Sequence, residues 1–169
     1  MRSRNGSQRF FETFLRVLIT LSTGTAIVLS SISICDGNWL RAPGPLFGVW
    51  DTCQAEKKPP CSEEMVRLST VMVVVRTSVC LAVVLAIFGL ELMMVSQLCD
   101  DGHSRKRWAL GCAMLLVGFL LSSTGTVTYI FLLRDIYGTF TLTFWAQFLA
   151  VFLFFLNASS GIYLNRLTA

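Results

Sequence analysis

The chain has 169 residues, of which 54% are hydrophobic and only 14% are charged. Soluble domains carry about 25% charged residues, so this composition excludes an ordinary soluble protein and indicates a membrane protein. The formal net charge of +4 does not indicate nucleic-acid binding, because the basic residues flank apolar segments and form no patch interleaved with aromatic side chains.

Four apolar segments are long enough to cross a bilayer, since each has the roughly 20 residues that a hydrocarbon core about 30 Å thick requires. They cover residues 14–34, 77–98, 108–133 and 140–164. Backbone polar groups in lipid must bond within their own segment, so we predict four helices in a single all-α membrane domain. Cleavage of the first segment as a signal peptide is the weaker interpretation, because its apolar run exceeds the usual 7 to 15 residues.

The distribution of basic residues predicts the orientation. Eight arginines and lysines lie on the side of the bilayer that holds both termini: Arg2, Arg4, Arg9, Arg16, Arg105, Lys106, Arg107 and Arg166. The positive-inside rule therefore places residues 1–13, 99–107 and 165–169 in the cytoplasm. Residues 35–76, which include the outer approach to the second helix, and residues 134–139 are then extracellular. We expect a multi-pass protein of the plasma membrane with both termini cytoplasmic.

Cys53 and Cys61 lie in the first extracellular segment. Thiols pair in that oxidising compartment, and a bond between them closes a loop of nine residues. Closing such a loop contributes about 2.5 kcal/mol to stability. A segment this short cannot fold on an apolar core alone, so we predict a small disulfide-bonded cap. Two free thiols are the alternative. Trp39 and Trp50 are expected at the membrane interface, with their indole N–H groups in water.

Gly111, Gly118 and Gly125 recur every seven residues along the third helix, which keeps them on one face. Small residues let another helix approach closely and favour association in lipid. We favour packing within the bundle over contact with a partner protein.

Glu91 is a carboxylate about two turns inside the cytoplasmic end of the second helix, where an unpaired charge costs a few kcal/mol. We expect it to face the bundle interior and to form an ion pair with Arg16, which enters the first helix from the same side. The alternative is a protonated Glu91 that bonds to a backbone carbonyl or to a hydroxyl such as that of Ser22 or Thr23.

Residues that carry chemistry are scarce. His103 is the only histidine, and with Cys99 it supplies two metal ligands, too few for a closed tetrahedral site. No nucleophile with a base on its own side of the membrane and no phosphate-binding glycine loop is apparent. We therefore expect no enzyme, no metal and no cofactor. Cys99 lies where the second helix meets the cytoplasm, a position suited to palmitoylation; an unmodified thiol is equally expected.

A tryptophan, a glycine-containing triplet and two cysteines form a motif: Trp39, Gly48, Val49, Trp50, Cys53 and Cys61. It resembles the W–GLW–C–C signature of the superfamily that contains claudins, peripheral myelin protein and calcium-channel gamma subunits, with valine in place of leucine. The resemblance implies a claudin-like bundle of four transmembrane helices under a small, disulfide-bonded, β-rich extracellular cap.

Longer strings resemble the gamma-like subunits of voltage-dependent calcium channels; they are residues 10–16, 29–40, 87–104 and 155–162. This resemblance implies an auxiliary subunit that binds the pore-forming subunit of a voltage-gated calcium channel and modulates its current. The alternatives are a claudin-type junction or adhesion protein and a trafficking tetraspan of the epithelial membrane protein kind. Adhesion is disfavoured, because residues 134–139 offer little surface and residues 166–169 lack a motif for PDZ scaffolds.

Overall fold

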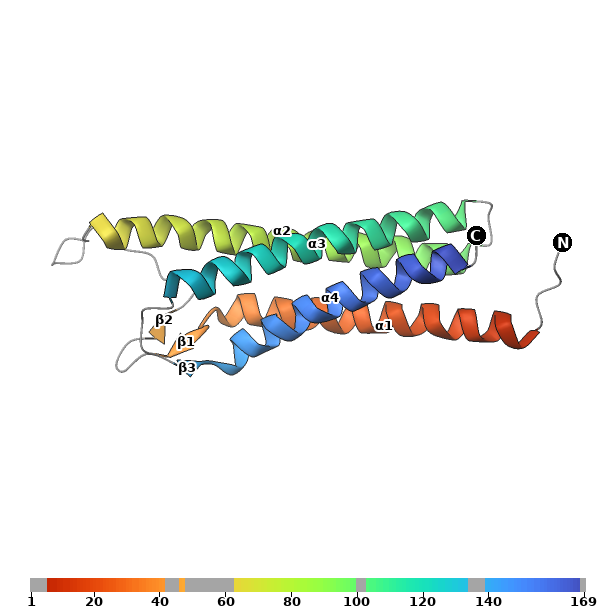
Figure 1. The fold of residues 1–169 in the computed structure, drawn as a ribbon, viewed down its shortest axis with the longest axis horizontal. Coiled ribbons are helices and arrows are strands. Elements are labelled where there is room, and N and C mark those ends of the chain that lie inside the picture. The colour runs from red at the N-terminus through yellow and green to blue at the C-terminus, as the bar shows by residue number, and fades with distance from the viewer. Residues whose placement is uncertain (1–5, 42–45, 48–62, 100–102, 134–138, 168–169) are drawn as a thin grey trace.

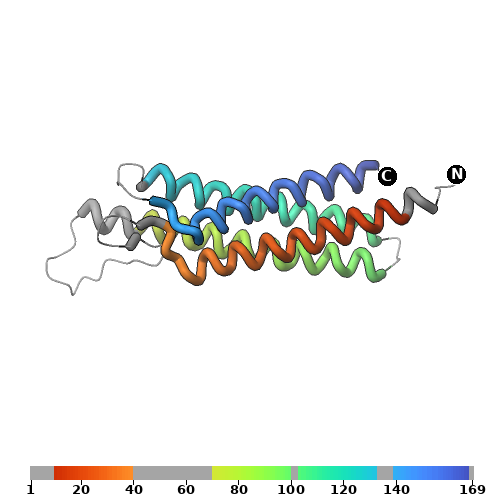
Figure 2. The backbone as a smooth tube through the Cα atoms, turned by 90° about the horizontal axis from the view of Figure 1, so that it is seen from below, coloured from red at the N-terminus to blue at the C-terminus, as the bar shows by residue number. Residues whose placement is uncertain are grey.

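The computed structural model describes residues 6–41, 46–47, 63–99, 103–133 and 139–167. Four long helices account for most of them: α1 (Gly6–Asp36), α2 (Glu63–Leu98), α3 (Ser104–Leu133) and α4 (Leu142–Leu167). They run side by side along the length of the molecule, and α1 begins at the same end at which α4 finishes (Figures 1 and 2).

Each helix contains a segment long and apolar enough to cross a membrane. Within the described residues these segments are Phe10–Asp36, Thr70–Leu98, Ser104–Leu132 and Leu142–Leu167. The shortest has 26 residues, which at 1.5 Å per residue exceeds a hydrocarbon core about 30 Å thick. The predicted architecture of four membrane-spanning helices is confirmed, and the chain is a multi-pass membrane protein.

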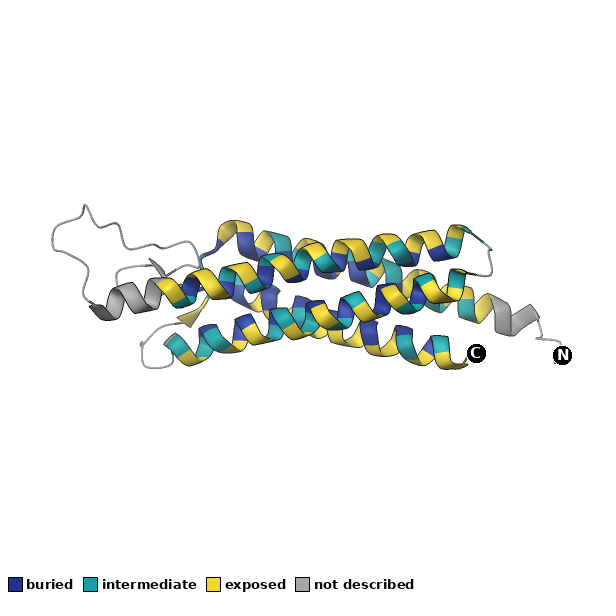
Figure 3. Ribbon diagram, turned by 90° about the horizontal axis from the view of Figure 1, so that it is seen from above, coloured by how far each residue is buried: buried dark blue, intermediate teal, exposed yellow. Residues whose placement is uncertain are grey.

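The helices form a ring in which each contacts two neighbours. Helix α2 packs against α3 and α1, and α4 packs against the same two helices from the other side. Buried residues form a stripe along the inner face of each helix, whereas the outer faces are exposed (Figure 3). These outer faces carry large apolar side chains such as Phe131 and Phe152. Apolar outer faces are expected where lipid, rather than water, surrounds a bundle.

Helix α2 begins at Glu63, well before the predicted start of the membrane segment at residue 77. Met72, Val75 and Val79 recur at helical spacing on its inner face and are buried against Trp39 and Tyr129. The helix extends beyond the predicted membrane segment because the inner face of its first part also packs against other residues of the bundle.

A small antiparallel sheet lies at the end of the bundle opposite the start of α1 (Figure 1). Its strands are β1 (Leu40–Arg41), β2 (Leu46–Phe47) and β3 (Thr139–Phe140), in the order β2-β1-β3. In β1, Leu40 lies opposite both Phe47 and Phe140. The sheet therefore joins the segment that follows α1 to the segment that precedes α4.

The predicted boundary between the segment 134–139 and the fourth membrane helix needs correction. Residue 140 was assigned to the fourth membrane helix, but it lies in β3, and α4 begins at Leu142. Pairing with β1 holds this stretch extended. A β-rich, disulfide-bonded cap is not shown, since the described strands have two residues each. The motif residues Gly48, Val49, Trp50, Cys53 and Cys61 lie outside the described residues.

Candidate functional site

The first candidate region is the end of the bundle that carries the sheet, where the chain turns sharply after α1. Gly37 has a φ of 64°, and its N–H donates to the Ser33 carbonyl at 3.0 Å. A left-handed residue of this kind ends many helices, and glycine adopts it without strain. The turn sends Trp39 back onto the helix end, where its indole N–H donates to the same Ser33 carbonyl at 3.0 Å.

Trp39 is the centre of an aromatic cluster that all four helices share. It is fully buried, and it meets Tyr129 of α3 edge-on at 4.9 Å between ring centroids and Phe144 of α4 at 6.1 Å. Helices α1 and α2 supply the other walls: Ile34, Met72, Val75 and Val79. Because the cluster around Trp39 draws on all four helices, it fixes their relative positions at this end.

The burial of Trp39 corrects the prediction of an interfacial ring with a wet N–H. That prediction treated the indole as a group without a protein partner. Tyr129 and Phe144 supply its apolar surroundings, and the Ser33 carbonyl accepts its hydrogen bond. A buried indole whose N–H is satisfied has no need of water.

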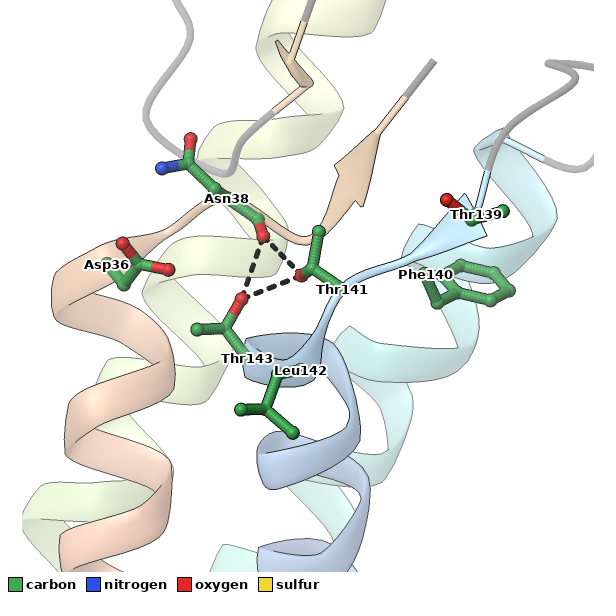
Figure 4. A pocket seen from close by; sticks show the side chains of 7 residues that line it. All are labelled: Asp36, Asn38, Thr139, Phe140, Thr141, Leu142 and Thr143. Atoms are coloured by element: carbon green, nitrogen blue, oxygen red, sulfur yellow. Dashed lines mark hydrogen bonds between the residues drawn. The ribbon is translucent and has the colours of Figure 1, made fainter.

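A pocket of about 500 Å³ opens beside this cluster, lined in part by Asp36, Asn38 and the first residues of α4 (Figure 4). The Asn38 carbonyl accepts hydrogen bonds from the hydroxyls of Thr141 and Thr143, the second at 2.7 Å. Ser33 donates its hydroxyl to the Thr143 carbonyl at 2.7 Å. These hydroxyls therefore bind the end of α1 to the start of α4, and Asp36 contributes the carboxylate of the pocket.

The pocket lacks the donor set of a metal centre. Among the described residues, no group of three or more histidine, cysteine, aspartate or glutamate side chains could hold an ion. Its lining mixes the apolar side chains of Phe140 and Leu142 with Asn38, three threonines and the carboxylate of Asp36.

A second polar cluster lies inside the bundle, between three helices. Gln147 of α4 is fully buried. Its Oε1 accepts a hydrogen bond from Ser30 of α1 at 2.9 Å, and its Nε2 donates to Ser122 of α3 at 2.7 Å. Side-chain bonds between helices help association in lipid, where water does not compete. Gln147 was not among the predicted site residues, although an amide in a largely apolar membrane segment was a usable signal.

Replacing Gln147 with leucine is expected to destabilise the bundle by about 1–2 kcal/mol, because two interhelical hydrogen bonds are lost. Phe148→Leu is the matched control, since Phe148 is the exposed neighbour of Gln147. Unfolding by SDS in mixed micelles measures both. Equal unfolding curves for the two variants would show that the Ser30–Gln147–Ser122 cluster adds nothing to stability.

The opposite end of the bundle has a buried tryptophan of its own. Trp108 at the start of α3 is fully buried, and its indole N–H donates to the Gly161 carbonyl of α4 at 3.1 Å. The Arg16 guanidinium of α1 lies over the ring, 4.9 Å from its centroid. Gln97 of α2 donates to the Thr20 hydroxyl of α1 at 2.7 Å. Polar and aromatic contacts thus join the four helices here as well.

The three glycines of α3 lie against α2, inside the bundle. A Cβ added to Gly111 would lie 2.8 Å from the Gly89 carbonyl oxygen, and one added to Gly125 would lie 2.9 Å from Val79. At Gly118 the corresponding distance to the Ala82 carbonyl oxygen is 3.2 Å. The absence of side chains lets the two helices approach to backbone contact.

Glu91 does not face the interior, so the orientation that we expected for it is wrong. Its side chain is exposed on α2. The buried positions of this helix include Gly89 and Met93, which point toward α3, and residue 91 falls on the opposite side of the helical wheel. Arg16 contacts Trp108, and its pairing with Glu91 stays a prediction.

Cys99 directly follows α2, and its N–H donates to the Val95 carbonyl at 3.1 Å. The side chain is partly buried. Its palmitoylation stays a prediction.

Comparison with known proteins adds a relationship that covers the described and undescribed residues alike. A model of the voltage-dependent calcium channel gamma-like subunit protein family matches residues 1–169. A human protein named voltage-dependent calcium channel gamma-like subunit is 47% identical over 173 residues, which cover 98% of this chain and 90% of the human protein. The similarity therefore extends over nearly the full length of both chains.

Proposed function

The chain belongs to the voltage-dependent calcium channel gamma-like subunit protein family, and on this premise we propose that it is an auxiliary subunit of a voltage-gated calcium channel. In this proposal it associates with the pore-forming subunit and modulates the current. The observation that carries the proposal is the identity of 47% with the human protein of that name over 98% of the chain.

The interior of the bundle supports an auxiliary role. Side chains fill the space between the helices, and Ala26, Gln147 and Phe154 are each fully buried there. Gln147 uses its amide to hold helices together. Such packing suits a protein that presents its outer surface to another membrane protein. An auxiliary subunit changes a current by binding one state of the channel more tightly than another.

We further propose the plasma membrane as the location, with both termini in the cytoplasm. The basic residues near the termini and between α2 and α3 support this orientation. The sheet and the pocket beside Asp36 are then extracellular. In that compartment Cys53 and Cys61 form the disulfide bond of a β-rich cap, to which β1, β2 and β3 belong.

Serine at Cys53 or Cys61 is expected to reduce delivery to the cell surface several-fold, because the loop loses a cross-link worth about 2.5 kcal/mol. Cys35→Ser is the control, since Cys35 is a free, exposed cysteine at the same end of the bundle. Surface biotinylation measures delivery. Mass mapping of non-reduced peptides gives the direct test, and two free thiols in mature protein would contradict the cap.

The proposed function is tested by affinity purification of the protein from native membranes in mild detergent, followed by mass spectrometry. Recovery of a pore-forming calcium-channel subunit, together with an altered current when the two are co-expressed, supports the proposal. Recovery of claudins and junctional proteins would favour adhesion instead, and recovery of transport-vesicle proteins would favour trafficking.

A further inference from the structure

Glu91 stands out on the outer surface of the bundle. It is the only charged residue among residues 77–98, and its side chain is exposed. Around it the exposed side chains of α2 are apolar; they are Val84, Ile87, Phe88, Met94 and Val95. The carboxylate therefore lies in a stripe of exposed apolar side chains on α2.

Glu91 lies within the apolar span of α2 rather than at its end. Leu98, where α2 ends, comes seven residues after Glu91, which is about 10 Å along the helix axis at 1.5 Å per residue. Arginine and lysine reach the membrane surface from such depths with their long side chains, but glutamate is shorter. An ionised side chain at this depth is costly unless it has a partner.

Exposed threonine hydroxyl groups on the outer faces of the bundle find their hydrogen-bond partners within their own helices. Thr25, Thr77 and Thr124 are exposed, and each donates its hydroxyl to the carbonyl four residues earlier in its own helix. An ionised carboxylate cannot satisfy itself in this way, because it only accepts hydrogen bonds and the backbone N–H groups of a helix interior are already used. An ionised Glu91 therefore needs a partner from outside its helix, whereas a protonated Glu91 would donate to a backbone carbonyl.

From this placement we propose that Glu91 is the polar contact of a docking surface on α2 for a transmembrane helix of the partner channel subunit. The surface consists of Glu91 with Ile87, Phe88, Met94 and Val95. The occupying helix carries an arginine or lysine at the depth of Glu91. This proposal rests on the proposed function, since it names the surface by which the auxiliary subunit binds.

Charge complementarity argues for a basic partner. A basic side chain in a membrane helix has the same need for a counter-charge that Glu91 has. Pairing satisfies both groups at once, and the apolar side chains around Glu91 exclude water from the contact. The contact would also set the register of the two helices, because only one depth brings the charges together.

The first experiment compares recovery of the pore-forming subunit with full-length wild type, Glu91→Leu and Ser160→Leu, co-expressed and purified in mild detergent. Ser160 is exposed on α4, so its variant makes the same kind of change on another face. We expect Glu91→Leu to lower recovery about tenfold, the factor that corresponds to about 1.4 kcal/mol, and Ser160→Leu to leave it unchanged. Glu91→Gln, which keeps a hydrogen-bonding group, should fall between them.

Two results of this experiment overturn the proposal in different ways. If wild type and Glu91→Leu recover the subunit equally, the docking surface is wrong and the proposed function stands. If neither recovers it, the proposed function falls and the docking surface with it. Thermal unfolding of the isolated variants is measured in parallel. Destabilisation by Glu91→Leu that matches that by Arg16→Ala would show that Glu91 serves its own bundle, and would also overturn the proposal.

The second experiment identifies the occupant. A photo-crosslinking residue in place of Met94 is expected to capture a channel segment that contains an arginine or lysine, while the same residue in place of Phe152 on α4 is not. Both positions are exposed. Capture of a segment without a basic residue, of lipid alone, or of a second copy of this chain would contradict the proposal.

Discussion

Replacing Trp39 with alanine is expected to destabilise the bundle by about 3–5 kcal/mol, the range found for removing a large aromatic side chain from a packed core. The ring is fully buried and contacts Tyr129 and Phe144 edge-on. Its removal also leaves the Ser33 carbonyl without the indole donor. Because the cluster draws on all four helices, we expect separation of the sheet-bearing ends and poor delivery to the cell surface.

Trp145→Ala is the matched control for this prediction, since Trp145 is 55% exposed at the same end of the bundle. Trp39→Phe tests the hydrogen bond separately, because phenylalanine restores most of the apolar ring and no donor. Thermal unfolding in detergent and surface biotinylation measure all three variants. If Trp39→Ala and Trp145→Ala have the same unfolding temperature, the aromatic cluster does not hold the helices together.

The four membrane helices could be predicted because apolar length is a local property of the sequence. The role of Trp39 could not, because it depends on Tyr129 and Phe144, which are close only after the chain has folded. The same holds for β3, which becomes a strand through pairing with β1. Sequence alone placed Trp39 at the membrane interface, Thr139 in a loop and Phe140 in the fourth membrane helix.

The polar residues show the same limit. Glu91 was recognised as costly in a membrane, but its inward orientation was inferred from what such residues usually do. The helical phase that puts Glu91 outside is set by the contacts of Gly89 and Met93 with α3. Gln147 was missed, although its burial between Ser30 and Ser122 gives the bundle its central hydrogen bonds. The residue type of Glu91 predicted that it is costly in a membrane, whereas the packing of α2 against α3 decided on which side of the helix it lies.

The two ends of the bundle are held together by the same kind of contact. At each end a fully buried tryptophan donates its N–H to a helix carbonyl: Trp39 to Ser33 and Trp108 to Gly161. Between them, α2 and α3 touch through backbone atoms. Gly89 belongs to this contact as much as the glycines of α3 do, since a Cβ added to it would lie 3.0 Å from the Gly111 carbonyl oxygen. The helix pair therefore depends on glycine from both sides.

Replacing Gly111 with leucine is expected to destabilise the bundle by about 1–3 kcal/mol or more, the range for overpacking a core. Even a methyl group there would lie 2.8 Å from the Gly89 carbonyl oxygen, and a backbone atom cannot move aside as a side chain can. Gly24→Leu is the control, because a Cβ added to Gly24 has no neighbour within 4 Å. That change should be neutral or stabilising by up to about 1 kcal/mol, since leucine favours a helix more than glycine does. SDS unfolding in mixed micelles measures the difference.

Gly118→Leu should destabilise the bundle by an amount between those of Gly24→Leu and Gly111→Leu, because the nearest atom to a Cβ added at Gly118 is 3.2 Å away. The graded order ties stability to the closeness of α2 and α3, and a loss of stability equal at all three positions would instead point to the helix backbone itself.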